Sequence, residues 1–214
     1  MNNLALISLR NDHLNDRNET RDSIDTAIYD LISEMNLIPL LVPNSPAYTN
    51  DLENIFNIED VKCVLFSGGN DLDILKNKGA KNICMTRDKV ELNLIEFCKK
   101  NDIPIIGICR GFQLIANYLG ANINKIEGHI NVIHEVTMIE SLKKIQVNSF
   151  HSFGLKNNNL PSNIKPLAYY IKDNTIECFR TITPFRSLNF MWHPERFKGA
   201  KIDSIKLIKN YLKF

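Results

Sequence analysis

The chain has 214 residues, 44% of them hydrophobic, which is enough to bury the core of one α/β domain. Its 26 basic and 24 acidic residues give a formal net charge of only +2, and the lysines are scattered, so no basic patch for nucleic acid is indicated. No apolar run approaches the ~20 residues that a membrane-spanning helix needs. We therefore expect a single domain over residues 1–214, with neither a nucleic-acid nor a membrane partner.

The N-terminal apolar run at residues 4–9 is too short for a signal peptide, and no cationic segment precedes it. The five cysteines are irregularly spaced and include no C-x-x-C pair, so neither a disulfide framework nor a zinc site is indicated. We therefore expect a cytoplasmic location, where thiols stay reduced.

The first half of the chain alternates short apolar runs with segments in which apolar residues recur at helical spacing. The predicted strands are 4–9, 37–42, 61–66 and 105–109, and the predicted helices are 24–35, 90–98 and 112–119. Strands that are apolar almost throughout and are separated by helices are typical of a parallel sheet covered on both faces. The sequence thus predicts an α/β fold whose parallel central sheet is flanked by helices.

The second half contains apolar runs with short connections between them. The predicted strands are 132–139, 145–147, 167–171, 175–180 and 188–192, and a final helix is predicted over 202–212. Short connections favour antiparallel pairing, so these strands predict a small antiparallel β extension of the parallel sheet. The polar run 156–159 is predicted to be an exposed loop.

One cysteine stands where a strand meets a helix. The segment Gly107-Ile108-Cys109-Arg110-Gly111 follows a buried strand and opens a helix, which is typical of a nucleophile presented on a tight turn. Glycines suit such a turn because Cβ atoms would crowd it. The partial positive charge of the helix N-terminus favours a thiolate there. We therefore predict that Cys109 is a catalytic nucleophile rather than a small buried core residue.

A thiol nucleophile needs a base, and the base needs an orienting group. His193 and Glu195 end a predicted strand and flank Pro194, which fixes the backbone so that both can project to one side. The carboxylate would hold the imidazole tautomer and stabilise the imidazolium. An ordinary surface turn is the alternative. Combined with the cysteine motif, the pattern predicts the catalytic triad Cys109, His193 and Glu195.

Acyl transfer also needs amide donors for the oxyanion of its tetrahedral intermediate. Gly68 and Gly69 follow the strand over 61–66, where their backbone N–H groups are not blocked by side chains. The N–H of Arg110, directly after the nucleophile, is the natural second donor. A simple turn is the alternative interpretation of the two glycines.

Together these motifs resemble the class I glutamine amidotransferase-like superfamily and, within it, the γ-glutamyl hydrolases of the peptidase C26 group. The resemblance covers nearly the whole chain and rests on five motifs in the family's order. They are Phe66–Asp71, Arg87-Asp88 with Glu91, Pro104–Gln113, Val147–His151 and Trp192–Glu195.

The resemblance implies a flavodoxin-like sheet and the hydrolysis of a small-molecule γ-glutamyl amide through a glutamyl thioester on Cys109. It also implies that Gln113, with the main chain around Ser149 and Phe150, binds the α-amino and α-carboxylate ends of the glutamyl group. No metal or organic cofactor is implied, and a homo-oligomer stays open.

Three departures from the family pattern concern the leaving group. Ser152-Phe153 replaces a second histidine and a glutamine, Gly120-Ala121 replaces a glycine pair, and Ile74 replaces a proline. We therefore expect a leaving amine other than γ-aminobutyrate. The compact chain most resembles the branch that hydrolyses γ-glutamyl-CDP-amidate to glutamate and cytidine diphosphoramidate in capsule phosphoramidate biosynthesis.

A diphosphate on the leaving group would need cationic or amide contacts. The arginine candidates, which the sequence does not rank, are Arg17, Arg21, Arg87, Arg110 and Arg180. His151 is a candidate to support the glutamyl pocket. The residues interpreted as structural are His13, His129 and His134, which have no carboxylate at ligand spacing, and the core cysteines Cys63, Cys84, Cys98 and Cys178.

Two other functions stay open. A glutaminase subunit that passes ammonia to a separate synthetase would carry the same triad, but it would be nearly inactive alone and activated by its partner. The absence of a fused synthetase domain, together with Arg87, Asp88 and Glu91, favours the hydrolase. A non-catalytic binding module is the third hypothesis, because fold does not imply function; the intact triad argues against it.

Overall fold

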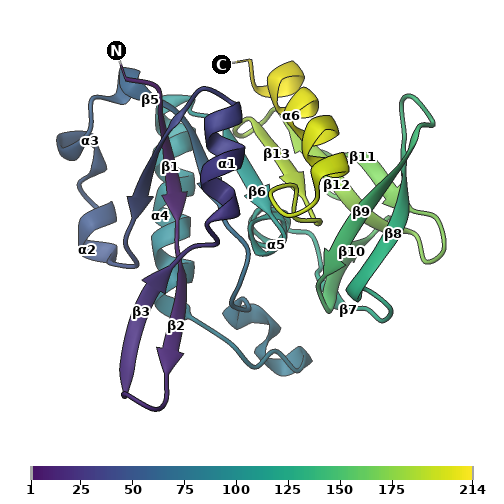
Figure 1. The fold of residues 1–214 in the computed structure, drawn as a ribbon, viewed down its shortest axis with the longest axis horizontal. Coiled ribbons are helices and arrows are strands. Elements are labelled where there is room, and N and C mark those ends of the chain that lie inside the picture. The colour runs from purple at the N-terminus through teal and green to yellow at the C-terminus, as the bar shows by residue number, and fades with distance from the viewer. Residues whose placement is uncertain (1, 214) are drawn as a thin grey trace.

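The computed structural model describes residues 2–213 and places five parallel strands at the centre of the molecule (Figure 1). They are β1 (Leu4–Ser8), β4 (Ile38–Val42), β5 (Val61–Phe66), β6 (Ile105–Ile108) and β13 (Ser187–Phe190). Their spatial order is β4-β1-β5-β6-β13, so the parallel strands, counted along the chain, run 2-1-3-4-5. This is the flavodoxin-like order, and the predicted fold class is confirmed.

Helices cover both faces of this sheet. They are α1 (Ala27–Glu34) and α6 (Lys198–Leu212) on one face, and α4 (Met85–Asn101) and α5 (Arg110–Tyr118) on the other. Successive strand residues enter different cores: Leu6 packs with the α4–α5 layer, whereas Ile7 packs with the α1–α6 layer. Because side chains alternate along a strand, a sheet covered on both faces needs apolar residues at every position. Among residues 2–213, no helix has the length and apolar composition to cross a membrane.

The sheet continues beyond β13 as an antiparallel extension, as predicted. The added strands are β12 (Thr175–Thr181), β11 (Lys165–Tyr170), β8 (Ile130–Met138) and β9 (Lys144–Phe150), with the short β7 (Asn124–Lys125) and β10 (Phe153–Lys156) beside them. The assignment of residues 188–192 to this extension is wrong in part. β13 pairs in parallel with β6 and antiparallel with β12, so it joins the two halves of the sheet.

A hairpin of β2 (Arg10–Leu14) and β3 (Glu19–Ser23) projects from the end of β1 and was not predicted (Figure 1). Its residues are polar on both faces, so no apolar alternation indicates it. Short helical turns also lacked a periodic signal: α2 (Pro46–Thr49), α3 (Leu52–Ile55), η1 (Ile58–Asp60) and η2 (Asp73–Lys78). The predicted loop is exposed, although Lys156 itself ends β10.

Candidate active site

Cys109 lies between β6 and α5, at the carboxyl edge of the parallel sheet. Its backbone has φ 50° and ψ −94°, a conformation that costs a residue with a Cβ about 1–3 kcal/mol. The Cys109 N–H donates to the Phe190 carbonyl over 2.7 Å, and the side chain is 8% exposed at the wall of a cavity. The predicted strand–turn–helix setting of this cysteine is confirmed.

The glycines on either side of Cys109 are required by close packing. A Cβ on Gly107 would lie 2.5 Å from Asn189 Oδ1, and a Cβ on Gly111 would lie 2.6 Å from the Phe66 carbonyl oxygen. Both distances are shorter than any van der Waals contact. Glycine at 111 is needed for α5 to approach β5, and glycine at 107 leaves room on β6 for the Asn189 side chain and the start of α5.

His193 and Glu195 lie directly after β13 and point toward each other. His193 Nδ1 and Glu195 Oε1 are 2.7 Å apart, and both side chains are buried. Asn148, on β9, fixes the His193 backbone from the opposite side. Its Oδ1 accepts the His193 N–H over 2.8 Å and its Nδ2 donates to the His193 carbonyl over 3.0 Å. No sequence pattern indicated this positioning role, although Asn148 lies within the motif Val147–His151.

The charge state of His193 follows from its neighbours. Burial lowers its pKa, but the charge and hydrogen bond of Cys109, and then the hydrogen bond to Glu195, outweigh burial and raise the pKa to about 9. His193 is therefore protonated at neutral pH. The protonated imidazole thus lies beside the Cys109 side chain.

Gly68 and Gly69 lie on the loop after β5, where Gly68 faces the imidazole of His193 and Gly69 faces the Arg10 side chain. A Cβ on Gly68 would lie 2.6 Å from His193 Cε1, and Gly69 has a φ of 83° that disfavours any other residue. The two glycines thus serve different needs: the first makes room for the imidazole, and the second turns the backbone.

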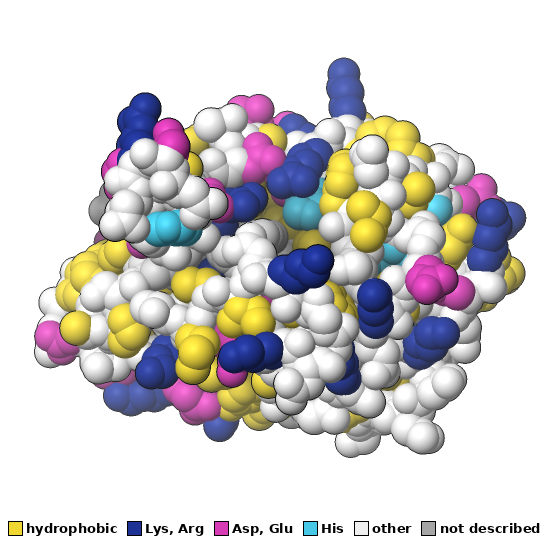
Figure 2. Space-filling view, turned by 90° about the horizontal axis from the view of Figure 1, so that it is seen from below, with side chains coloured by type: hydrophobic (Ala, Val, Ile, Leu, Met, Phe, Trp, Pro, Cys, Tyr) yellow, Lys and Arg dark blue, Asp and Glu magenta, His cyan; other side chains and the backbone are white. Residues whose placement is uncertain are grey.

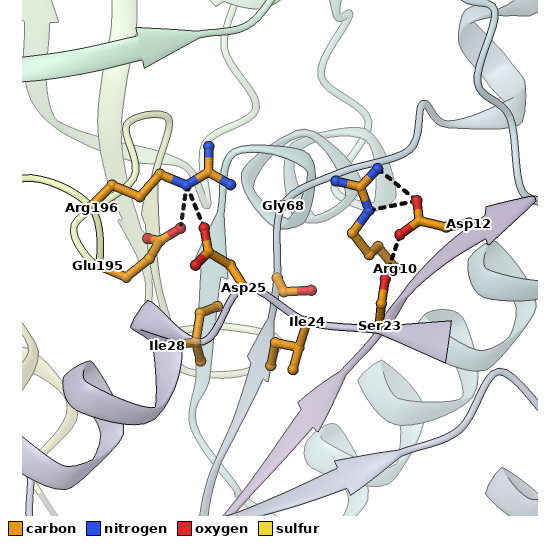
Figure 3. A pocket seen from close by; sticks show the side chains of 10 residues that line it. Arg10, Asp12, Ser23, Ile24, Asp25, Ile28, Gly68, Glu195 and Arg196 are labelled. Carbon is orange, nitrogen blue, oxygen red and sulfur yellow. Dashed lines mark hydrogen bonds and ion pairs between the residues drawn. The ribbon is translucent and has the colours of Figure 1, made fainter. Parts of the chain in front are cut away.

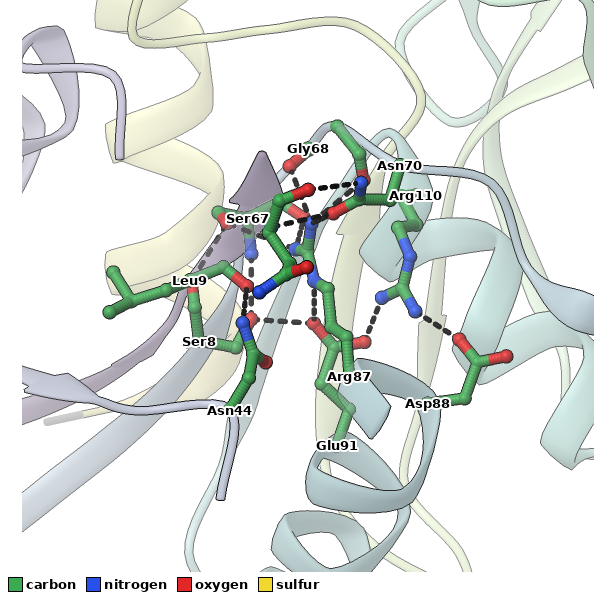
Figure 4. Close-up of polar contacts among 12 residues, drawn as sticks. Ser8, Leu9, Asn44, Ser67, Gly68, Asn70, Arg87, Asp88, Glu91 and Arg110 are labelled. Carbon is green, nitrogen blue, oxygen red and sulfur yellow. Dashed lines mark hydrogen bonds and ion pairs between the residues drawn. The ribbon is translucent and has the colours of Figure 1, made fainter. Parts of the chain in front are cut away.

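The carbonyl groups of this loop point toward one buried guanidinium (Figure 4). Arg87, on α4, donates to the carbonyl oxygens of Ser67, Gly68 and Gly69 over 2.6, 3.1 and 2.7 Å. In a trans peptide the N–H points opposite to the C=O, so the N–H groups of Gly69 and Asn70 point away from Arg87. Gly69 and Asn70 also line the cavity, which fits the predicted oxyanion loop.

Carboxylates hold the guanidinium in turn. Arg87 Nε donates to Glu91 Oε1 over 2.9 Å, and Glu91 also accepts from Ser8 Oγ and from Arg110, which pairs with Asp88 as well. Burial raises the pKa of Glu91, but Arg110 and Arg87 bring it below its usual value. Removing one partner from such a buried network costs about 3–5 kcal/mol. The R-D-x-x-E motif thus supports both the glycine loop and the nucleophile helix.

One cavity of about 260 Å³ connects most of the predicted site residues. Those that line it are Gly69, Cys109, Arg110, Gln113, Phe150 and His193. Gly68 and Glu195 line a neighbouring hollow of about 280 Å³ (Figure 3). Ser149 lines neither, because its side chain is fully buried and its Oγ donates to the His129 carbonyl over 2.7 Å.

Two of the residues predicted to hold the glutamyl group, Gln113 and Phe150, line the same cavity as Cys109. Gln113 Nε2 donates to the Phe153 carbonyl over 3.0 Å, which fixes the amide at the cavity. The Phe150 ring is 43% exposed and packs edge-on against His193, with 5.9 Å between ring centroids. The glutamyl-binding roles of Gln113, Ser149 and Phe150 stay predictions.

Apart from Arg110, the arginines at the cavity are not those that the sequence suggested. Arg10 and Arg196 line both hollows, and basic side chains stand at the rim of the hollowed face in Figure 2. Arg10 Nε donates to Asp12 and Arg196 Nε donates to Asp25, each over 2.8 Å (Figure 3). Both arginines follow the carboxyl ends of parallel strands, where ligands of such sheets bind. Their place after predicted strands was the sequence signal that could have identified them.

The five arginine candidates have other partners. The side chains of Arg87 and Arg110 belong to the buried network, Arg17 and Arg21 pair with hairpin carboxylates, and Arg180 stacks on a tyrosine at another hollow. Their predicted side-chain contacts to a leaving group are therefore not supported.

Two predictions about the remaining cysteines and histidines need correction. Cys84 is half-buried at the start of α4 rather than in the core, whereas the other cysteines predicted to be structural are buried, as expected. His129 and His134 were interpreted as structural because no carboxylate stands at ligand spacing in the sequence, but the fold brings one to both. Glu177, brought in by β12, lies 3.5 Å from a ring nitrogen of each.

Gly68→Ala should slow catalysis without unfolding the protein. The new Cβ would push the His193 imidazole, and displacing a catalytic group by ~1 Å costs about 10²-fold in rate. We expect kcat for glutamate release to fall by about 10–100-fold with little change in the unfolding temperature. Gly199→Ala is the matched control, because a Cβ there meets only an ordinary contact at 3.6 Å. An unchanged kcat in Gly68→Ala would contradict the close approach.

Comparisons with known proteins agree with this geometry. The peptidase C26 family model matches residues 5–195. The gamma-glutamyl-CDP-amidate hydrolase of Campylobacter jejuni is 37% identical over 152 residues, 71% of this chain and 70% of that protein. The carbamoyl phosphate synthase small chain of Buchnera aphidicola is 28% identical over 183 residues, 85% of this chain and 45% of that protein.

The fold has counterparts among solved structures. The crystal structure of a glutamine amidotransferase from Thermotoga maritima aligns with a TM-score of 0.63, at 18% identity, over 100% of this chain and 85% of that one. At this identity the likeness shows the fold alone. The family match is stronger, because it spans both the strand that ends at Cys109 and the segment with His193 and Glu195. The chain therefore belongs to the peptidase C26 family, the cysteine-dependent γ-glutamyl hydrolases of the class I glutamine amidotransferase-like fold.

Proposed function

We propose that this hydrolase acts on γ-glutamyl-CDP-amidate and releases glutamate and cytidine diphosphoramidate. The observation that carries the proposal is the pair Arg10 and Arg196 beside the cavity of Cys109. Guanidinium groups bind phosphate oxygens through charge-assisted, often bidentate hydrogen bonds. The identity of 37% to a hydrolase of this substrate supports the same leaving group.

In the first half of the reaction, Cys109 Sγ attacks the γ-carbonyl carbon of the glutamyl group. The oxyanion that forms accepts hydrogen bonds from the backbone N–H groups of the Gly68–Gly69 loop and of Arg110. His193 then gives its proton to the amide nitrogen, and the C–N bond breaks. Cytidine diphosphoramidate leaves, and a glutamyl thioester stays on Cys109.

In the second half, the neutral His193 takes a proton from a water molecule, whose oxygen attacks the thioester carbonyl. The C–S bond breaks, glutamate leaves, and Cys109 returns as a thiolate beside the imidazolium. Glu195 holds the ring through Nδ1 in both halves. The predicted roles of Gln113 and the main chain near Ser149 and Phe150 are to hold the α-amino and α-carboxylate groups throughout.

The purified protein should be assayed alone for glutamate release from γ-glutamyl-CDP-amidate, glutamine and γ-glutamyl-γ-aminobutyrate. A preference of at least ~100-fold in kcat/KM for the nucleotide amidate is the expected result. A preference for γ-glutamyl-γ-aminobutyrate would refute cytidine diphosphoramidate as the leaving group, while the protein would still be a γ-glutamyl hydrolase.

Arg10→Gln should weaken binding of the nucleotide amidate only. Losing a charge-assisted hydrogen bond costs ~1.5–3 kcal/mol, which corresponds to a rise in KM of about 10–150-fold. KM for glutamine should stay unchanged, because glutamine carries no phosphate. Arg21→Gln, on the exposed hairpin, is the matched control. Equal effects of Arg10→Gln on both substrates would show that the diphosphate does not contact Arg10.

A second candidate function is the glutaminase subunit of an amidotransferase. The similarity to a carbamoyl phosphate synthase small chain favours it, although the chain spans less than half of that protein. It predicts that the purified chain is nearly silent on every γ-glutamyl amide and that glutamine turnover appears only with a synthetase partner. The assay of the protein alone therefore separates the two functions.

A further inference from the structure

A second cluster of reactive side chains lies in the antiparallel extension and is not used by the proposed reaction. His129 precedes β8, His134 lies on β8, His151 lies between β9 and β10, and Glu177 lies on β12. All four are at least nine-tenths buried. The carboxylate of Glu177 is the common neighbour: His129 Nδ1, His134 Nε2 and His151 Nε2 lie 3.5, 3.5 and 3.8 Å from its oxygens.

Two of the histidines have their ring proton committed on the side away from Glu177. His129 Nε2 lies 2.9 Å from Asp173 Oδ2, and His151 Nδ1 lies 3.1 Å from the Phe153 carbonyl oxygen. Both partners are acceptors, so these nitrogens carry the hydrogen. In the neutral ring the other nitrogen then presents a lone pair, and in both residues it is the one nearest Glu177.

The nitrogens that face Glu177 have no hydrogen-bond partner. This holds for His129 Nδ1, His134 Nε2 and His151 Nε2; Glu177 Oε2 is without a partner as well, while its Oε1 accepts from Thr175 Oγ1 over 3.3 Å. Lone pairs and a carboxylate that face one another in a buried site repel, and each buried unsatisfied polar group costs about 1–3 kcal/mol. In the neutral rings, His129 Nδ1 and His151 Nε2 therefore turn lone pairs toward the Glu177 carboxylate, and a cation among them would relieve this repulsion.

We propose that these four residues bind one divalent zinc-type ion. The ligand atoms of His129, His134 and Glu177 lie within 4.8 Å of one another, with His151 beside them. Imidazole and carboxylate suit zinc, whose bonds of about 2.0–2.1 Å place tetrahedral ligands roughly 3.3 Å apart. The distances from the Glu177 oxygens to the three histidine nitrogens, 3.5, 3.5 and 3.8 Å, are close to that value, whereas ligand atoms up to 4.8 Å apart would have to move closer on binding.

The surroundings of the cluster are those of a metal site. Asp173 accepts a hydrogen bond from His129, which is the carboxylate–histidine–metal arrangement that orients a ligand. The Tyr170 ring stacks on His134, with 4.3 Å between centroids. Four protein ligands fill a tetrahedral ion, so the site is closed and structural rather than catalytic.

The ion would stiffen one wall of the active-site cavity. The His129 carbonyl accepts from Ser149 Oγ over 2.7 Å and from the His151 N–H over 3.2 Å. The segment between these two residues carries Phe150, which lines the cavity. By joining β8, β12 and the β9–β10 turn, the ion would fix the segment that is predicted to hold the glutamyl group.

The test is zinc binding by the full chain after treatment with a chelator, in a Cys109→Ala background that removes the competing thiolate. We expect a single zinc ion per chain by elemental analysis and a higher unfolding temperature with zinc. Cobalt should bind in its place and give the visible absorption of a tetrahedral nitrogen–oxygen site, without a thiolate band. Zinc affinity should fall at least ~100-fold in His134→Ala and in Glu177→Gln.

His13→Ala is the matched control, because His13 is exposed on the hairpin and its loss should leave zinc binding unchanged. The proposal is overturned if the folded parent binds no stoichiometric zinc or cobalt, since protons must then supply the missing charge. It is equally overturned if His134→Ala and Glu177→Gln bind zinc as tightly as the parent. Even if neither variant folds, the cobalt spectrum of the parent shows whether a tetrahedral nitrogen–oxygen site is present.

Discussion

Cys109→Ala should abolish γ-glutamyl hydrolysis. The methyl group cannot form the thioester, and loss of the nucleophile in a comparable triad costs about 10⁴–10⁶-fold in kcat. The substrate should still bind, because the glycine loop, Gln113 and the cavity are retained. The measurements are single-turnover glutamate release and calorimetric titration with a γ-glutamyl amide.

Cys84→Ala provides the control for this substitution. Cys84 is half-buried at the start of α4 and does not line the active-site cavity, so its loss should leave kcat and KM unchanged. Substantial turnover by Cys109→Ala would show that another group attacks the carbonyl, and the thioester mechanism would then be wrong. Lost turnover with retained binding excludes a module that only binds its ligand.

Glu195→Gln should lower kcat by about 10³–10⁴-fold while the fold is retained. The amide is nearly isosteric with the carboxylate, but it neither stabilises an imidazolium nor fixes the correct tautomer of His193. Steady-state kinetics measure the loss. Glu59→Gln, at an exposed position, is the control and should be indistinguishable from the parent.

The pH profile distinguishes this role of Glu195 from a merely structural one. In the parent, His193 keeps its proton up to its raised pKa of about 9, so kcat/KM should fall as the pH rises through that value. The hydrogen bond and negative charge of Glu195 help to raise this pKa. In Glu195→Gln the alkaline limb of the kcat/KM profile should therefore move to lower pH. An unchanged limb would show that Glu195 does not raise the pKa of His193.

The buried network below the glycine loop gives the site its rigidity. Arg87 contacts three successive carbonyl groups of the loop and is itself held by Glu91, which also pairs with Arg110 next to the nucleophile. The glycine loop and the turn at Cys109 thus contact the same group of buried charges. This coupling explains how two segments distant in sequence keep a common geometry at the cavity.

The sequence by itself determined the parallel core, the nucleophile turn and the chemistry of the proposed triad. These features depend on short-range patterns: apolar runs covered on both faces, glycines at positions 107 and 111 where a Cβ would clash, and a proline between His193 and Glu195. Each pattern can be recognised within a few residues of the sequence, even where, as for Gly107 and Gly111, its physical reason is a tertiary contact.

Only the tertiary structure decided which polar side chains meet. Arg10 and Arg196 reach the cavity, Asn148 fixes the His193 backbone, and Glu177 lies among three histidines because strands far apart in sequence pair in a particular register. A shift of one residue in β9 or β12 would turn Asn148 or Glu177 to the opposite face of the sheet. No local pattern encodes that register, which is set by the packing of the whole sheet against its helices.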